Sequence, residues 1–183
     1  MCEKFGKEKS EDFFSQQQNE LQKLISEIRG KTKQQRKTLT KTILPRIALY
    51  RVLQASMTKE EAYDVVNDYL QTRVCAKMIK QYRVLEKLPN FFSIYRTVFS
   101  HIVLHHDNWK AECLFSNPNE FQINIHQCLW YDACLQSGCP ELTSAFCACD
   151  DTLYSCLHKM QFYRIGSIGR GDKLCDFHFT RNK

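Results

Sequence analysis

Thiols and carboxylates are concentrated in the last third of the chain. Eight of the ten cysteines lie between Cys113 and Cys175. The last third of the chain also holds four aspartates that could do acid–base chemistry beside a thiol, namely Asp150, Asp151, Asp172 and Asp176. The first hundred residues have no comparable density of reactive side chains. We therefore expect any active or binding site to lie in this stretch.

The segment FCACDD, residues 146–151, combines a thiol with a carboxylate at a helical spacing. Asp150 follows Cys147 by three residues, which places both on the same side of a helical turn. A cysteine attacks as a thiolate and needs a nearby base or positive charge. Asp150 is the candidate base or proton shuttle, and three other side chains could favour the thiolate: His126, Arg164 and Arg170. The competing interpretation is that Asp150 or Asp151 caps the following element and Cys147 is core.

The same cysteines could instead hold a metal ion. The sequence lacks the C-x-x-C pair that is typical of zinc ribbons and fingers. A zinc or iron site could still assemble from distant elements, with His126 or His158 joining the alternative ligands Cys139, Cys147, Cys149 and Cys175. Free cysteines are also common as small buried hydrophobic side chains. We therefore expect no cofactor and place most of these thiols in the core.

Arg164 lies in a predicted strand whose flank is otherwise apolar. A half-buried arginine requires a carboxylate, from the protein or from a ligand, and binds it through two parallel hydrogen bonds. The glycines that follow, Gly166, Gly169 and Gly171, do not match the G-x-G-x-x-G order of phosphate loops, and no helix is predicted after them. We interpret them as the connection of a hairpin, which needs positive φ angles.

Composition and charge argue against several classes of partner. The net charge is +6, and the basic residues gather in Lys31–Lys41 and around Lys77–Lys87 without the strong bias and aromatic interleaving of nucleic-acid binders. The amino terminus has no apolar signal-peptide region, and no apolar run reaches the ~18 residues that a membrane span needs. A cysteine-rich chain of this kind is expected in the reducing cytoplasm, without a membrane or nucleic-acid partner.

Apolar periodicity predicts helices across the first hundred residues. Ser10 would cap a first helix, and Gly30 would close it. The basic segment Lys31–Thr42 is predicted as a linker or a frayed helical start. Pro45 fits the first turn of the next helix, because a proline in a helix interior costs about 3 kcal/mol.

Two further helices are predicted before the helical periodicity of the sequence ends near His105. Thr58 and Glu61 form a capping box, in which each side chain bonds the backbone amide of the other. The helix that it starts can run through Leu85 and must stop before Pro89. Asn90 would cap another helix, rich in aromatic residues.

Beyond His105 the pattern favours strands. Phe121–Cys128 alternates with period two, so that Phe121, Ile123 and Ile125 share one face. Other expected strands are 109–115, 160–166 and 174–180. The stretch 129–135 is expected to be a helix, and 141–151 a short helical or turn element. The whole pattern predicts an α+β fold, with N-terminal helices packed on a C-terminal antiparallel sheet that has helical insertions.

Together, three segments resemble the L-2-amino-thiazoline-4-carboxylic acid hydrolase family. They carry an upstream cysteine, a PEL-like turn, an FC-x-x-D element and a closing R-x-G-x-x-x-x-G-D-x-x-C-D-F pair of strands. In this sequence these elements are Cys128, Pro140–Leu142, Phe146-Cys147 with Asp150, and Arg164 to Phe177. The resemblance covers roughly Leu44 to Phe179, so that residues 41–183 would form a hydrolase-like α+β domain after a helical extension of residues 1–40.

The resemblance implies a hydrolase that opens a cyclic amidine. Its family substrate is 2-amino-thiazoline-4-carboxylate, which gives N-carbamoyl-L-cysteine, or a related small molecule. Cys147, or a water activated by Asp150, would attack the amidine carbon, and Asp176 or His126 would move protons. Arg164 would hold the ring carboxylate, and we assign further substrate binding to Arg170, Cys128 and Asp172. A metal-bound water is the rival nucleophile.

A non-catalytic protein is the alternative. The closing G-D-x-x-C-D-F hairpin is also similar to the end of four-vinyl-reductase-like domains, which bind ligands on an α+β scaffold. The chain would then be a small-molecule or metal-binding sensor. A redox or cluster protein is a third possibility. In each case the expected partner is a small molecule, and a homo-oligomer is possible.

Overall fold

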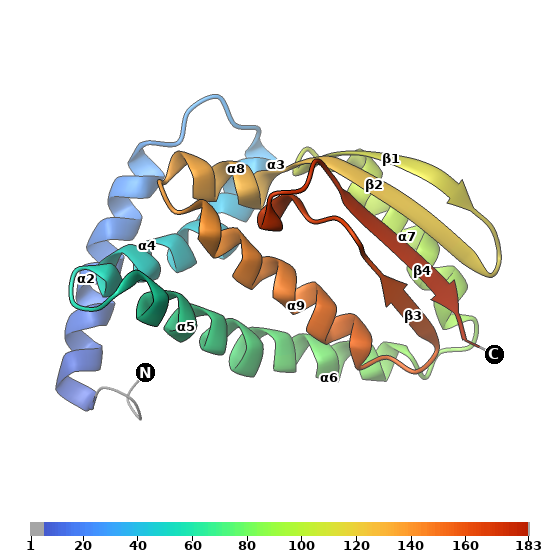
Figure 1. Ribbon diagram of the computed structural model, residues 1–183, viewed down its shortest axis with the longest axis horizontal. Coiled ribbons are helices and arrows are strands. Elements are labelled where there is room, and N and C mark those ends of the chain that lie inside the picture. Colours follow the sequence, from blue (N-terminus) through green and yellow to red (C-terminus); the bar gives the residue numbers. More distant parts are fainter. Residues whose placement is uncertain (1–5, 183) are drawn as a thin grey trace. The chain divides into compact units, whose positions relative to one another are not determined.

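The computed structural model describes residues 6–182 (Figure 1). Contacts between Cα atoms divide the chain into two compact units, Met1–Asn67 and Asp68–Lys183. This division shows which residues form compact units. The boundary that the sequence predicts at residue 40 is of another kind, because it separates a helical extension from a hydrolase-like domain. That boundary therefore stays a prediction.

The first unit is helical. Its elements are α2 (Lys7–Ser26), α3 (Lys33–Thr38), the π-helical turn η1 (Leu39–Ile43), α4 (Leu44–Gln54) and most of α5 (Lys59–Tyr69). Helices α2 and α4 pack against each other, and Arg51 forms an ion pair with Glu20 at 2.8 Å. The predicted ends of the first helix were wrong. Ser10 lies inside α2, where its Oγ donates to the carbonyl of Gly6 at 2.7 Å, and the helix ends four residues before Gly30.

The basic segment that follows is helical from Lys33, the second of the two predicted alternatives. Thr32 and Gln35 form a capping box at the start of α3, and η1 then leads directly into α4, with Pro45 in its first turn as predicted. Proline has no amide hydrogen, so the carbonyl four residues earlier loses its helical donor. The carbonyl of Lys41, four residues before Pro45, accepts a hydrogen bond from Arg46 Nη1 at 3.1 Å.

A second π turn divides the next long helix. Helix α5 begins with the predicted capping box, in which the Thr58 amide donates to Glu61 Oε2 at 2.9 Å and the Glu61 amide donates to Thr58 Oγ1 at 3.2 Å. The π turn η2 (Leu70–Cys75) connects α5 to α6 (Ala76–Leu85). The helix therefore stops before Pro89, as the sequence predicted.

Helix α7 (Phe91–His105) provides much of the core of the second unit. It begins at the predicted residue, but Asn90 has a left-handed backbone, with φ of 57°, and its side chain makes no capping hydrogen bond. The aromatic side chains of α7 pack on the sheet: the ring centroids of Phe92 and Phe121 are 5.9 Å apart, and those of Phe99 and Phe179 are 5.1 Å apart. The aromatic side chains Phe91, Phe92 and Tyr95 of α7 are therefore part of the core.

The sheet is antiparallel and confirms the α+β class. Its strands are β1 (Trp109–Ser116), β2 (Glu120–Cys128), β3 (Met160–Tyr163) and β4 (Cys175–Arg181), in the spatial order β1-β2-β4-β3. Between β2 and β3 the chain forms α8 (Leu129–Gln136), the short η3 (Pro140–Leu142) and α9 (Thr143–Ser155). Phe121, Phe179 and Phe162 lie opposite one another on three adjacent strands, so the predicted apolar face of β2 is confirmed.

A buried carboxylate joins α6 to the connection between α9 and β3. Glu86 is largely buried, and its Oε1 accepts the backbone amides of His158 and Lys159, both at 2.6 Å. We expect Glu86→Ala to lower the free energy of unfolding by about 2–3 kcal/mol, because hydrogen bonds to a charged group are strong and two amides lose their acceptor. Urea denaturation measures this loss. Glu86→Gln keeps an acceptor oxygen and should lose much less, so equal losses in both variants would contradict the assignment.

Candidate functional site

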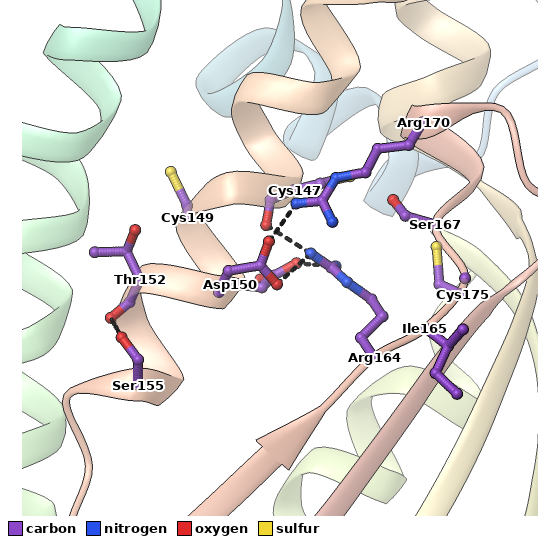
Figure 2. A network of polar contacts seen from close by, with 12 residues as sticks. Cys147, Cys149, Asp150, Thr152, Ser155, Arg164, Ile165, Ser167, Arg170 and Cys175 are labelled. Atoms are coloured by element: carbon purple, nitrogen blue, oxygen red, sulfur yellow. Dashed lines mark hydrogen bonds and ion pairs between the residues drawn. The ribbon is translucent and has the colours of Figure 1, made fainter.

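A polar cluster of the second unit lies between α9 and the connection that follows β3. Arg164 follows β3 directly and reaches back to α9 (Figure 2). Its Nη2 donates to Asp151 Oδ1 at 2.6 Å and to the carbonyl of Cys147 at 2.9 Å. Its Nη1 donates to Asp150 Oδ2 at 3.3 Å. One guanidinium group thus fixes three positions of the segment that the sequence singled out.

The charge of Arg164 is held inside the protein. Its side chain is only 2% exposed, and its guanidinium carbon lies 5.5 Å and 5.2 Å from the ring centroids of Phe162 and Phe177. Burial opposes the charge, but the carboxylates of Asp150 and Asp151 outweigh it and raise the Arg164 pKa. The sequence predicted a carboxylate partner for this arginine. The described partners are two carboxylates of the protein itself.

Removal of Arg164 should be costly. Arg164→Met keeps an apolar stem between the two phenylalanine rings but leaves Asp150 and Asp151 without their shared cation. We expect the free energy of unfolding to fall by about 3 kcal/mol, the low end of the cost of breaking a buried ion pair. Urea denaturation at pH 7 measures it, and addition of Asp150→Asn should restore part of the loss. Unchanged stability in Arg164→Met would show that the ion pairs contribute little.

Asp150 has the protonation behaviour of a general base. Its side chain is 35% exposed, yet dense protein surrounds its carboxyl group. Burial raises the pKa of Asp150 to about 6, with Asp151 adding to the increase and the Arg164 guanidinium opposing it. A carboxylate with such a pKa is mostly ionised at pH 7 and still accepts a proton readily.

The thiol of Cys147 lies beneath the short helical turn η4 (Ile168–Arg170). A methyl group at Gly169 would approach Cys147 Sγ to 2.7 Å, so only glycine allows this close contact. Burial raises the pKa of the Cys147 thiol, while the nearby Ser167 hydroxyl and the charges of Arg164 and Arg170 lower it. Cys147 is therefore a thiol at rest, in a setting that partly compensates a negative charge on sulfur.

Arg170 is the more accessible cation of the cluster. Its Nη2 lies 2.5 Å from Asp151 Oδ2, and 48% of its side chain is exposed. Asp151 is thus shared between Arg164 and Arg170. The sequence suggested Asp151 as a helix cap. Its ion pairs with both arginines make Asp151 part of the cluster.

Two predicted site aspartates hold the loop backbone. Asp176 Oδ1 accepts the amides of Ile165 at 3.0 Å and Gly166 at 2.6 Å, and Asp172 Oδ2 accepts the amide of Ser167 at 2.8 Å. In these contacts the carboxylates shape the connection that carries Arg164 and Arg170. Their role in proton transfer or substrate binding stays a prediction.

An isosteric substitution separates these roles for Asp176. Asp176→Asn keeps the oxygen that accepts both amides, so we expect turnover within about threefold of the wild type, a change well under 1 kcal/mol. A proton-transfer role would instead cost about 10²–10⁴-fold. Steady-state kinetics of the two proteins decide between them. Asp176→Ala, which removes the acceptor altogether, is the control that should disturb the loop.

The structure places His126 away from these contacts. His126 Nε2 lies 2.9 Å from Glu112 Oε1 on β1, and both side chains are well exposed. Cys128 ends β2, and its thiol lies near enough to Cys147 to interact with it. Burial raises the pKa of Cys128 to about 12, so it is uncharged at neutral pH.

The alternative metal ligands are distributed over separate contacts. Cys139 interacts with Cys134, whereas the backbone carbonyl of Cys149 accepts a hydrogen bond from the Cys75 thiol at 3.3 Å. Cys175 Sγ accepts the amide of Ile168 at 3.2 Å. Within residues 6–182 no three His, Cys, Asp or Glu side chains are arranged to hold a metal ion. The zinc or iron alternative gains no support from this arrangement.

The fold and cluster define an α+β protein in which a thiol, two carboxylates and two guanidinium groups converge on one helix. The model of the L-2-amino-thiazoline-4-carboxylic acid hydrolase family matches residues 35–179. The chain belongs to this family, which confirms the resemblance seen in the sequence. A search of curated proteins found no match.

Proposed function

We propose that the protein is a hydrolase that opens the ring of 2-amino-thiazoline-4-carboxylate or of a closely related cyclic amidine. The observation that carries the proposal is Asp150, a carboxyl group with a pKa of about 6, held by Arg164 one helical turn from the thiol of Cys147. A base with this pKa and a nucleophile on the same turn are what a two-step hydrolysis needs. Family membership supports the reaction class.

In the first step the Cys147 thiol loses its proton to Asp150, and its sulfur attacks the amidine carbon of the substrate. The tetrahedral centre then collapses, the ring carbon–sulfur bond breaks, and the substrate sulfur leaves with a proton from Asp150. The result is a covalent isothiourea, in which the former amidine carbon is bonded to Cys147. The positive charges of Arg164 and Arg170 support the sulfur anion before attack.

In the second step a water molecule attacks the same carbon. Asp150 accepts the proton of this water, the bond to the Cys147 sulfur breaks, and the thiol recovers its proton. One water has been added in total, and N-carbamoyl-L-cysteine is the product of the family substrate. Asp150 therefore serves both steps, which a carboxyl group with a pKa near neutrality can do.

We assign the substrate carboxylate to Arg170 rather than to Arg164. Arg164 is 2% exposed and already bonds Asp150, Asp151 and a backbone carbonyl. Arg170 is 48% exposed, and its ion pair with Asp151 uses one guanidinium nitrogen, Nη2. An arginine binds a carboxylate best with two parallel N–H groups, and Arg170 retains that capacity. Arg164 instead fixes Asp150.

The proposed function also concerns the location of the protein and its partners. No helix among the described residues is long and apolar enough to cross a membrane. We retain a small-molecule substrate and a cytoplasmic location as proposals, and a homo-oligomer stays a prediction. The sensor alternative would need neither the near-neutral pKa of Asp150 nor a thiol beside it.

The test follows the thiol that ring opening sets free. Purified protein is incubated with 2-amino-thiazoline-4-carboxylate, and new thiol is measured with a chromogenic disulfide while mass spectrometry identifies the carbamoyl product. We expect steady release of thiol that a chelator does not inhibit. No release from folded protein would refute the substrate, and inhibition by the chelator would favour a metal-bound water over Cys147.

A further inference from the structure

Ser167, which no sequence motif singled out, carries a fully buried hydroxyl group in the loop above Cys147. The residue is 0% exposed, and its Oγ makes no hydrogen bond of good geometry with any described residue. Its main chain is firmly held. The amide donates to Asp172 Oδ2 at 2.8 Å, and the carbonyl accepts the amides of Arg170 at 2.9 Å and Asp172 at 3.1 Å. The hydroxyl is therefore positioned by its backbone and not by bonds of its own.

Two thiols are near enough to interact with this hydroxyl, those of Cys147 and Cys175. Figure 2 shows Ser167 beside Cys175 on the loop that faces α9. The sulfur of Cys175 already accepts the amide of Ile168 at 3.2 Å. Cys147 Sγ contacts the same loop at Gly169. Cys147 is thus the sulfur that could become a new acceptor for Ser167.

We propose that Ser167 is a positioning residue that donates a hydrogen bond to the Cys147 thiolate and so favours its formation. A buried hydroxyl without a partner is unfavourable, whereas an ionised sulfur is a strong acceptor for it. Loss of the Cys147 proton therefore satisfies Ser167 at the same moment. This inference rests on the proposed function, in which Cys147 attacks as a thiolate.

The test measures the reactivity of Cys147 without any substrate. The protein is treated with iodoacetamide over a range of pH, and peptide mass spectrometry gives the alkylation rate of Cys147 alone. Removal of a hydrogen bond to the charged form should raise the apparent pKa of Cys147 by about one unit in Ser167→Ala. The alkylation rate at pH 8 should then fall about three- to tenfold, because a more basic thiolate is also more nucleophilic. Turnover should fall with it, while the melting temperature stays equal or rises.

Thr143→Val is the matched control. Thr143 is also buried with an Oγ1 that lacks a hydrogen bond of good geometry, but its hydroxyl neighbours Cys134, and valine keeps its shape. An unchanged Cys147 profile in Ser167→Ala, or an equal shift in Thr143→Val, would overturn the role of Ser167. A shifted profile in a protein that does not open the thiazoline would refute the proposed function and leave the role of Ser167 standing.

Discussion

Replacement of the Cys147 sulfur by oxygen should abolish ring opening. In Cys147→Ser we expect thiol release from 2-amino-thiazoline-4-carboxylate to fall at least about 10³-fold, a cautious bound given the ~10⁶-fold loss when a hydrolase loses its nucleophile. Serine is nearly isosteric, but its hydroxyl is a far weaker acid than a thiol, and the cluster offers only a carboxylate with a pKa of about 6 to deprotonate it. Steady-state and single-turnover assays measure the loss.

Cys149→Ser is the control for this substitution. Cys149 lies two residues along α9 and is also partly exposed, but it interacts with Gln71 and Cys75 rather than with Ser167 and the arginines. We expect its activity to stay close to that of the wild type. Mass spectrometry should detect the covalent adduct in the wild type and in Cys149→Ser only. Full turnover in Cys147→Ser would instead assign the attack to a water activated by Asp150.

The second large effect is expected at Asp150. Asp150→Asn should lower kcat/KM by about 10²–10⁴-fold, the usual contribution of a general base. In the wild type the rate should rise with pH through about 6 as Asp150 loses its proton, and this limb should be absent from the variant. Asp151→Asn is the matched control, because it keeps an oxygen for the arginines and should retain the limb. An unchanged limb in Asp150→Asn would remove the assignment.

Stability should change in the opposite sense to activity in Asp150→Asn. The folded protein raises the pKa of Asp150 from an unfolded value of about 3.9 to about 6. A raised pKa contributes stability that is fully present below about pH 4 and is lost as the pH rises through about 6. At pH 7 the ionised Asp150 therefore lowers stability, and asparagine should relieve this. Thermal unfolding at pH 4 and pH 7 distinguishes loss of a base from loss of the fold.

Local patterns predicted most of the elements because each depends on neighbouring residues. The capping box at Thr58 and the alternation around Ile123 act within a few residues. The connection from β3 to β4 was predicted in part: of its glycines Gly171 has a positive φ, of 98°, whereas Gly169 is required by the close approach of Cys147.

The predictions were less exact where contacts between residues distant in the sequence determine which residues are helical. For Lys31–Thr42 the sequence left a linker and a frayed helical start open. The helical alternative holds, because Leu39 within the segment and Ile43 after it are buried in the first unit. Ser10 is a good cap by residue type, but the helix begins earlier.

The cluster was predictable in composition but not in its pairings. The sequence placed Cys147, Asp150 and Arg164 in one site, and the structure brings them together on α9 and after β3. The sequence could not show that Arg164 binds two aspartates of the protein, because the distance between the arginine and the aspartates depends on how the hairpin folds over the helix. It also could not show that Asp176 binds two loop amides, since a carboxylate that shapes a backbone has the same residue type as one that transfers protons.

The π turn η2 has a consequence for the chain length that this fold accepts. Leu70 and Cys75 are five residues apart and both buried, whereas in a regular α-helix such residues point about 140° apart. The wider turn absorbs one inserted residue without rotating the helix that follows it. Residues on either side thus keep their phase, and Cys75 still reaches the carbonyl of Cys149 on α9. The packing of this helix therefore requires a given direction for the side chains of Leu70 and Cys75, and not a given number of residues between the two.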